Sequence, residues 1–176
     1  RGVESTFDPN NVNPLWIEYY PNSRGEVGVI VGTEDLILEA IQDPTKDTIV
    51  IKPEITDEGP VIKFPTIPFP IDRNIDIIVP WKGDVIVKGP VTNAPIFSNG
   101  TGKIKFDLDN LTRLDFKNTK LAEGTAIQVV GGTLKANDLT SAFIKGNKDI
   151  SFKDVNLEFV NSTIVEATGT SKFTLD

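Results

Sequence analysis

The chain has 176 residues, 39% of them hydrophobic, which is enough for one well-buried core, and no change in composition marks a second domain. Its formal net charge of −7 repels phosphate backbones and anionic lipids, so we expect neither nucleic acid nor a membrane surface as a partner. No apolar run approaches the roughly 18 to 20 residues that cross a bilayer.

Histidine, cysteine and methionine are absent from the chain. Without histidine it lacks the commonest general base and transition-metal ligand, and without cysteine it lacks disulfides, thiol nucleophiles and thiolate metal sites. These absences predict a protein that is not an enzyme, with no catalytic residues and no cofactor. Because even an initiator methionine is missing, we expect a processed chain that is secreted and acts outside the cell or at its surface.

Residues 1–32 predict an extended arm or a hairpin, because turn-forming residues surround two β-prone runs at 15–20 and 27–31. The first run contains Trp16, Tyr19 and Tyr20. Three roles are open for these aromatic side chains: burial against the chain's own core, contact with another subunit, or stacking on a sugar.

A short helix is expected at about residues 34–42. Thr33 is a suitable N-cap, the acidic residues at 34 and 35 suit the positive helix start, and the apolar residues at 37, 40 and 41 share one face. The next strand is expected at 47–53, where Pro53 ends it.

From about residue 76 the pattern changes to short strands with Gly, Asn and Asp at the corners. Ile104, Phe106 and Leu108 alternate with charged residues, which indicates one buried and one solvated face. Units that end in Gly or Asn recur at 94–100, 126–132, 142–147 and 164–169, an imperfect repeat of about 20 residues. This predicts an all-β chain, a β-solenoid of about five or six short rungs over residues 33–176; an antiparallel sandwich is the alternative.

Two stretches resemble the opening of pectate-lyase-like right-handed parallel β-helices: the helical residues 33–42 and the strand at 47–53, which reads DTIVIKP. Residues 74–79 and 84–89 are similar to the second coil of that superfamily. The resemblance implies a right-handed parallel β-helix with an amino-terminal capping helix. It does not extend to chemistry, because Glu54 stands where glycine is usual and the superfamily's catalytic sets, acidic calcium ligands with an arginine base or paired aspartates with histidine and arginine, are not visible.

Three aspartates form the strongest pattern for a metal site. Asp107 and Asp109 point to the same side of one expected strand, and Asp115 lies on the next, so their carboxylates could coordinate calcium. Cations at positions 103, 105, 113 and 117 favour the other interpretation, a solvated face with salt bridges.

Three triplets match the acceptor pattern for N-glycosylation. They begin at Asn99, Asn110 and Asn161. They matter only if the protein is secreted by an organism that glycosylates its proteins.

The last six residues, Ser171–Asp176, have a strand pattern with no helix or proline after them. A solenoid end without a cap exposes strand edges and an apolar layer, so we expect Phe173 and Leu175 to be assembly contacts, together with the three aromatic residues of the arm. If the amino-terminal region of another copy covers this end, the contact repeats head to tail and builds a filament. The arm could add a strand to the neighbouring sheet.

We therefore expect a secreted, non-enzymatic structural subunit that assembles with identical subunits into an extracellular filament or surface array. The alternative is a carbohydrate-binding or polysaccharide-lyase-like β-helix, such as a viral spike or adhesin fragment, with glycans as partners. A third hypothesis is a domain cut from a longer adhesin, in which further chain covers the end of the solenoid.

Overall fold

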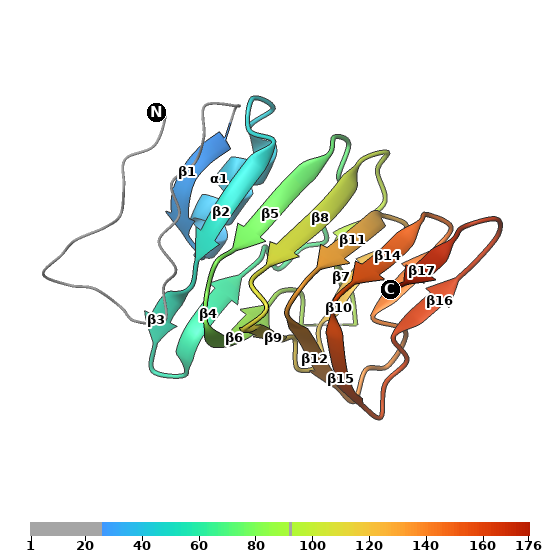
Figure 1. Cartoon of the computed structure of the whole chain (residues 1–176). Coiled ribbons are helices and arrows are strands. Elements are labelled where there is room, and N and C mark those ends of the chain that lie inside the picture. Colours follow the sequence, from blue (N-terminus) through green and yellow to red (C-terminus); the bar gives the residue numbers. More distant parts are fainter. Residues whose placement is uncertain (1–25, 92) are drawn as a thin grey trace, which may run out of the picture.

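The computed structural model describes residues 26–91 and 93–176. The chain forms a β-solenoid of about six turns, with one short helix near the amino-terminal end (Figure 1). The fold class predicted from the sequence is therefore confirmed. No helix within the described ranges has the length and apolar character needed to cross a membrane.

Three sheets form the walls of the solenoid, and neighbouring strands are parallel except in the hairpin of β3 and β4. The seven-stranded sheet holds, in spatial order, β1 (Glu26–Val31), β2 (Thr48–Lys52), β5 (Ile75–Val79), β8 (Lys103–Leu108), β11 (Ala126–Val130), β14 (Ile150–Lys153) and β17 (Phe173–Leu175). The six-stranded sheet holds β3 (Glu54–Thr56), β4 (Gly59–Lys63), β6 (Gly83–Lys88), β9 (Thr112–Asp115), β12 (Thr133–Asn137) and β15 (Asn156–Val160). The four-stranded sheet holds β7 (Pro95–Ser98), β10 (Lys120–Glu123), β13 (Ile144–Gly146) and β16 (Val165–Ala167).

Stacking in register places equivalent residues of successive coils in columns. Ile104, Ile127, Ile150 and Phe173 pair one above another, with a step of 23 residues each time. The step of about 20 expected from the sequence was therefore slightly short. The predicted repeat unit at 126–132 is also not equivalent to the other three. It contains β11 of the seven-stranded sheet, whereas the other three contain strands of the four-stranded sheet.

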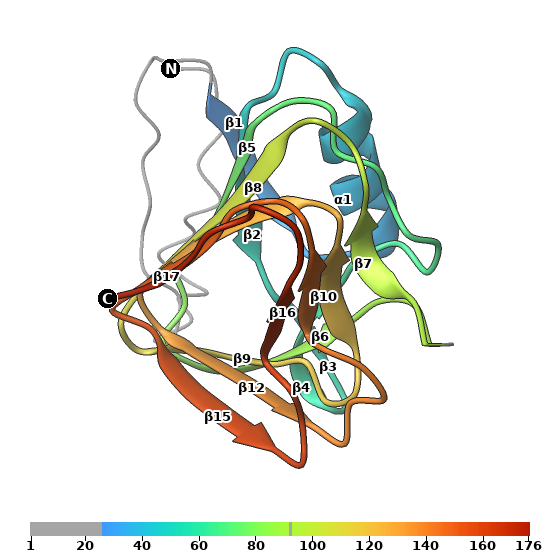
Figure 2. The same cartoon turned by 90° about the vertical axis from the view of Figure 1, so that its right-hand side faces the viewer.

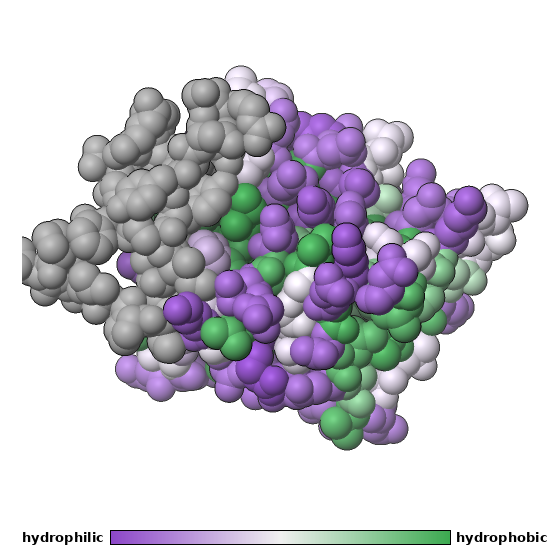
Figure 3. Space-filling view, viewed as in Figure 1, coloured by the Kyte–Doolittle hydropathy of each residue, from purple (hydrophilic) through white to green (hydrophobic). Residues whose placement is uncertain are grey.

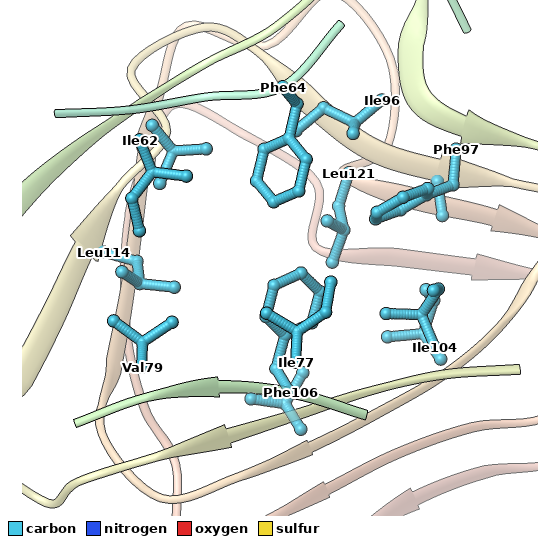
Figure 4. Close-up of a cluster of buried hydrophobic side chains, with 14 of the residues drawn as sticks. Ile62, Phe64, Ile77, Val79, Ile96, Phe97, Ile104, Phe106, Leu114 and Leu121 are labelled. Carbon is cyan, nitrogen blue, oxygen red and sulfur yellow. The ribbon is translucent and has the colours of Figure 1, made fainter. Parts of the chain in front are cut away.

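Alternating side chains fill the interior between the sheets. In β8 the apolar residues predicted to face inward are buried, and the residues between them face solvent. Phe64, Phe97 and Phe106 come from three separate parts of the chain and meet in the core, with ring centroids 5.6 to 6.4 Å apart (Figure 4). This is one continuous core, so burial of apolar area is the main stabilising contribution.

The predicted helix is confirmed as α1 (Glu34–Gln42). Thr33 has the extended conformation of an N-cap, but its side chain makes no capping hydrogen bond. Ile37, Ala40 and Ile41 are buried in the core cluster, so α1 closes the amino-terminal end of the interior. Residues 26–31 of the expected arm form β1, which pairs with β2 and extends the solenoid by one strand. The rest of the arm, with Trp16, Tyr19 and Tyr20, lies outside the described residues.

Candidate functional site at the carboxyl-terminal end of the solenoid

The last coil leaves an apolar layer exposed at the carboxyl-terminal end. The chain folds this way locally because residues 156–176 keep the alternation of the earlier coils and therefore aim the same positions inward. We define the end face by the residues that line its hollow: Leu157, Ser162, Ile164, Val165, Ala167, Phe173 and Leu175. Figure 2 looks onto this end, where β15, β16 and β17 form three sides of the last coil.

A comparison with the preceding coil shows what is unusual about this layer. Leu175 stacks directly on Phe152, and Phe173 stacks on Ile150. The lower member of each pair is buried, with Phe152 at 0% exposure, whereas Phe173 and Leu175 are 41% and 59% exposed. All four residues are large and apolar, so the exposure follows from the absence of a further coil over the last one among the described residues.

The hollow in the end face is wide and free of charge. Its volume is about 510 Å³, and its lining contains only apolar side chains and one serine. In Figure 3 hydrophobic colour gathers at the lower right, over the region of the last coils, while much of the neighbouring surface is hydrophilic. A contiguous exposed apolar surface of this kind is typical of an interaction site.

Open strand edges surround the hollow. The strands β15, β16 and β17 each end their sheet, and among the described residues each has a strand partner on one side only. Unpaired backbone N–H and C=O groups along such an edge can bind another strand. The end face can therefore offer both apolar area and backbone hydrogen bonds to a partner.

A charged network on the outer surface links the last coil to two earlier ones. The Arg113 guanidinium donates to Asp84 Oδ1 at 2.8 Å and to both carboxylate oxygens of Glu158 at 3.1 and 2.9 Å. These bonds link β6, β9 and β15. The hydrogen bonds from Arg113 also hold the pKa of the Glu158 carboxyl below its usual value, and those to Glu158 raise the pKa of Arg113.

The opposite end of the solenoid is closed by α1 and by Arg73. The guanidinium of Arg73 donates to the carbonyl oxygens of Ile41 and Asp43 at 2.7 Å and of Lys46 at 2.9 Å. The carbonyls at the end of a helix have no partner within the helix, so this side chain supplies one. Sequence reasoning did not find this role for Arg73, because the helix and the arginine are about 30 residues apart.

The predicted assembly residues are only partly within the described structure. Phe173 and Leu175 lie on the end face, and their role as assembly contacts stays a prediction. Leu157, Ile164 and Val165 belong to the same surface but were not predicted as contacts. Their position in the last repeat of the sequence could have indicated this, because a final coil exposes all of its inward side chains on the same side.

The three aspartates proposed for calcium do not form a cluster. Asp107 is on β8, Asp109 is in the corner after it and accepts the Leu111 N–H at 2.8 Å, and Asp115 is on β9 in another sheet. Lys117 Nζ lies 3.2 Å from Asp115 Oδ2. Within the described ranges no three His, Cys, Asp or Glu side chains gather closely enough to hold a metal ion.

The three asparagines of the glycosylation triplets are exposed at corners between strands. The triplet that begins at Asn110 ends with Thr112. The Thr112 side chain is fully buried, and its hydroxyl donates to the Trp81 and Val79 carbonyls. Asn161 Nδ2 donates to Asp138 Oδ1 at 3.0 Å, which lowers the pKa of that carboxyl. A glycan on Asn161 would replace one of the two Nδ2 hydrogens and leave the other to donate this hydrogen bond.

A buried lysine was also missed from the sequence. Lys120 is 7% exposed, and its Nζ donates to the backbone and side-chain oxygens of Asn93 at 2.7 and 3.2 Å and to Ser141 Oγ at 2.9 Å. These contacts join the loops before β7 and β13, which lie in the coils on either side of β10. Lys120 therefore acts as a structural link.

Comparison of the chain with protein-family models, with curated proteins and with solved structures finds no match. The resemblance to pectate-lyase-like β-helices therefore stays a prediction that depends on the sequence at 33–53 and 74–89. The function is therefore inferred from the geometry of the two ends of the solenoid.

Proposed function

We propose that this protein is a non-enzymatic structural subunit, secreted from the cell, that assembles with identical subunits into an extracellular filament or surface array. The observation that carries the proposal is the uncharged apolar end face with its three open strand edges. A surface that is both apolar and rich in unpaired backbone groups is stabilised when a partner covers it.

The sequence predicts two ways in which a second subunit could cover this end. One is head-to-tail stacking of solenoids, and the other is addition of a strand from the arm at residues 1–32. Both modes of assembly use the end face. A single set of variants on that face therefore tests the proposal, whichever of the two modes operates.

The test is to measure mass by light scattering over a range of concentrations for the unmodified protein and for Leu175→Asp. We expect the unmodified protein to associate and the variant to remain a monomer, because a carboxylate in this apolar contact would lose its hydration. Ile67→Asp is the matched control: Ile67 is 75% exposed but lies in a loop away from the end face, so association should persist. A protein that stays a monomer of 19.2 kDa at every concentration would refute the proposal.

A second function, glycan binding, is supported by a polar groove on the outer surface of the seven-stranded sheet. The groove has a volume of about 290 Å³ and includes Lys103, Gln128, Ser151 and Thr174. Lys103 Nζ already donates to Gln128 Oε1 at 3.1 Å, which orders the two side chains. A screen of the protein against a glycan array would test this function. Binding that is lost in Gln128→Ala would support it, and no binding across neutral and acidic glycans would exclude it.

A further inference from the structure

We infer that Asn99 is a site of spontaneous covalent modification, where the side-chain amide is lost as ammonia and the main chain isomerises to an isoaspartyl residue. The inference concerns the covalent stability of the solenoid wall, and it does not depend on how subunits assemble. It follows from the conformation that the fold requires at two adjacent residues, Asn99 and Gly100.

The corner after β7 requires a left-handed backbone at residue 99. Asn99 has a φ of 66°. The register of β7, β10 and β13 places Gly124 and Gly146 at the same position in the next two coils, and their φ angles are also positive, at 73° and 137°. Glycine adopts positive φ most readily, and asparagine and aspartate follow it. The asparagine at this corner therefore has a structural cause.

The residue after Asn99 has to be glycine. Gly100 has a φ of 96°, and a Cβ atom there would lie 2.0 Å from the Ile71 carbonyl oxygen. Gly102 is in the same position against Arg73, whose carbonyl oxygen would lie 2.2 Å from an added Cβ. The fold thus requires an asparagine directly before a glycine, and residues 99 and 100 form the only such pair in the sequence.

Asparagine is thermolabile because its side chain can close onto the main chain. The Gly100 nitrogen attacks Cγ of Asn99, and the side-chain nitrogen leaves as ammonia together with the hydrogen that Gly100 gives up. Water then opens the resulting cyclic imide at one of its two carbonyls, which gives either aspartate or isoaspartate. Because glycine has no Cβ, nothing on residue 100 obstructs the attack.

The structure leaves both reacting groups accessible. The Asn99 side chain is exposed, and its Nδ2 donates to the hydroxyl of the neighbouring Ser98 at 3.2 Å. Within the ranges that the structure describes, the Gly100 N–H has no hydrogen-bond partner. The pair also lies between β7 and β8, outside any strand. The local opening that ring closure needs costs least free energy in such a turn.

The isoaspartyl product does not fit this corner, because three successive coils are joined there. The Asn99 N–H donates to the Glu123 carbonyl at 2.9 Å. The Asn99 carbonyl accepts from the Ile71 N–H at 3.3 Å and from Thr125 Oγ1 at 3.0 Å. Isomerisation adds one carbon to the main chain before Gly100, which already packs on Ile71 without space for another carbon. The modification should therefore loosen the connection between the coils and lower the unfolding temperature.

The first test incubates the unmodified, folded protein in mildly alkaline buffer and measures the loss of amide at each asparagine by mass spectrometry of its peptides. Asn147 is the internal control, since it is exposed at the same corner two coils further along but is followed by Lys148. We expect the amide of Asn99 to be lost several times faster than that of Asn147. Loss at Asn99 that is no faster than at Asn147 would overturn the inference.

The variant Asn99→Gly tests the effect on the fold. It removes the reactive amide and keeps the left-handed corner, as Gly124 and Gly146 do in the next two coils. The unfolding temperature of the unmodified protein should fall during incubation in step with conversion at Asn99, while that of Asn99→Gly stays constant. An equal fall in both proteins, or no fall while Asn99 is converted, would contradict the inferred damage at this corner.

Discussion

The two ends of the solenoid differ in how the apolar side chains of the terminal coil are covered. At the amino-terminal end, α1 buries three apolar side chains against the core and receives Arg73 at its last carbonyls. At the carboxyl-terminal end the inward side chains of the last coil have no such cover among the described residues. The comparison shows that the burial of a coil's inward side chains depends on the layer stacked on it and not only on its own sequence.

The largest expected effect is on the free energy of unfolding, and it should differ between Phe152 and Leu175, which stack in one column. Phe152→Ala should lower the free energy of unfolding by about 3 to 5 kcal/mol, since it leaves a cavity in a closed layer. Leu175→Ala, one coil further along, should lower it by less than about 1 kcal/mol. Urea denaturation in dilute solution measures both. Equal losses would mean that the end face is covered even in the isolated subunit.

A smaller effect is expected at the capped end. Arg73→Met keeps much of the length of the side chain but leaves the carbonyls at the end of α1 without their donor, which should lower the free energy of unfolding by about 1 to 3 kcal/mol. Hydrogen exchange should become faster first in residues 34–42. Exchange that speeds up equally in every coil would contradict a local role in the cap.

The smallest effect concerns the charged network beside the end face. Because Arg113 lowers the pKa of Glu158 below its usual value of 4.5, the ionised Glu158 stabilises the fold above that pH, and the contribution is lost as the pH falls through the lowered pKa. Unfolding temperatures of Glu158→Gln and of the unmodified protein should differ at pH 7 and converge in acid. The difference should also shrink in high salt, because the pair is exposed to solvent. A difference that persists in acid would show that the substitution acts by some route other than charge.

The fold was largely predictable because it depends on local regularities. Alternation in β8, turn residues at the corners and the amphipathic pattern of α1 each use only neighbouring residues, and all were confirmed. The phase of the repeat was harder to obtain. The strand β10 has three buried residues and no alternation, so its pattern did not indicate a strand and its place in the four-stranded sheet was missed.

By itself the sequence determined which side chains point inward, since the period of two along a strand is a property of the backbone. Only the tertiary structure decided which of those inward side chains are covered. Phe152 and Leu175 occupy the same column and differ in exposure because, among the described residues, only Phe152 has a further coil stacked over it. Likewise Arg73 and Lys120 find their partners about 20 to 30 residues away, at distances along the chain that no local pattern encodes.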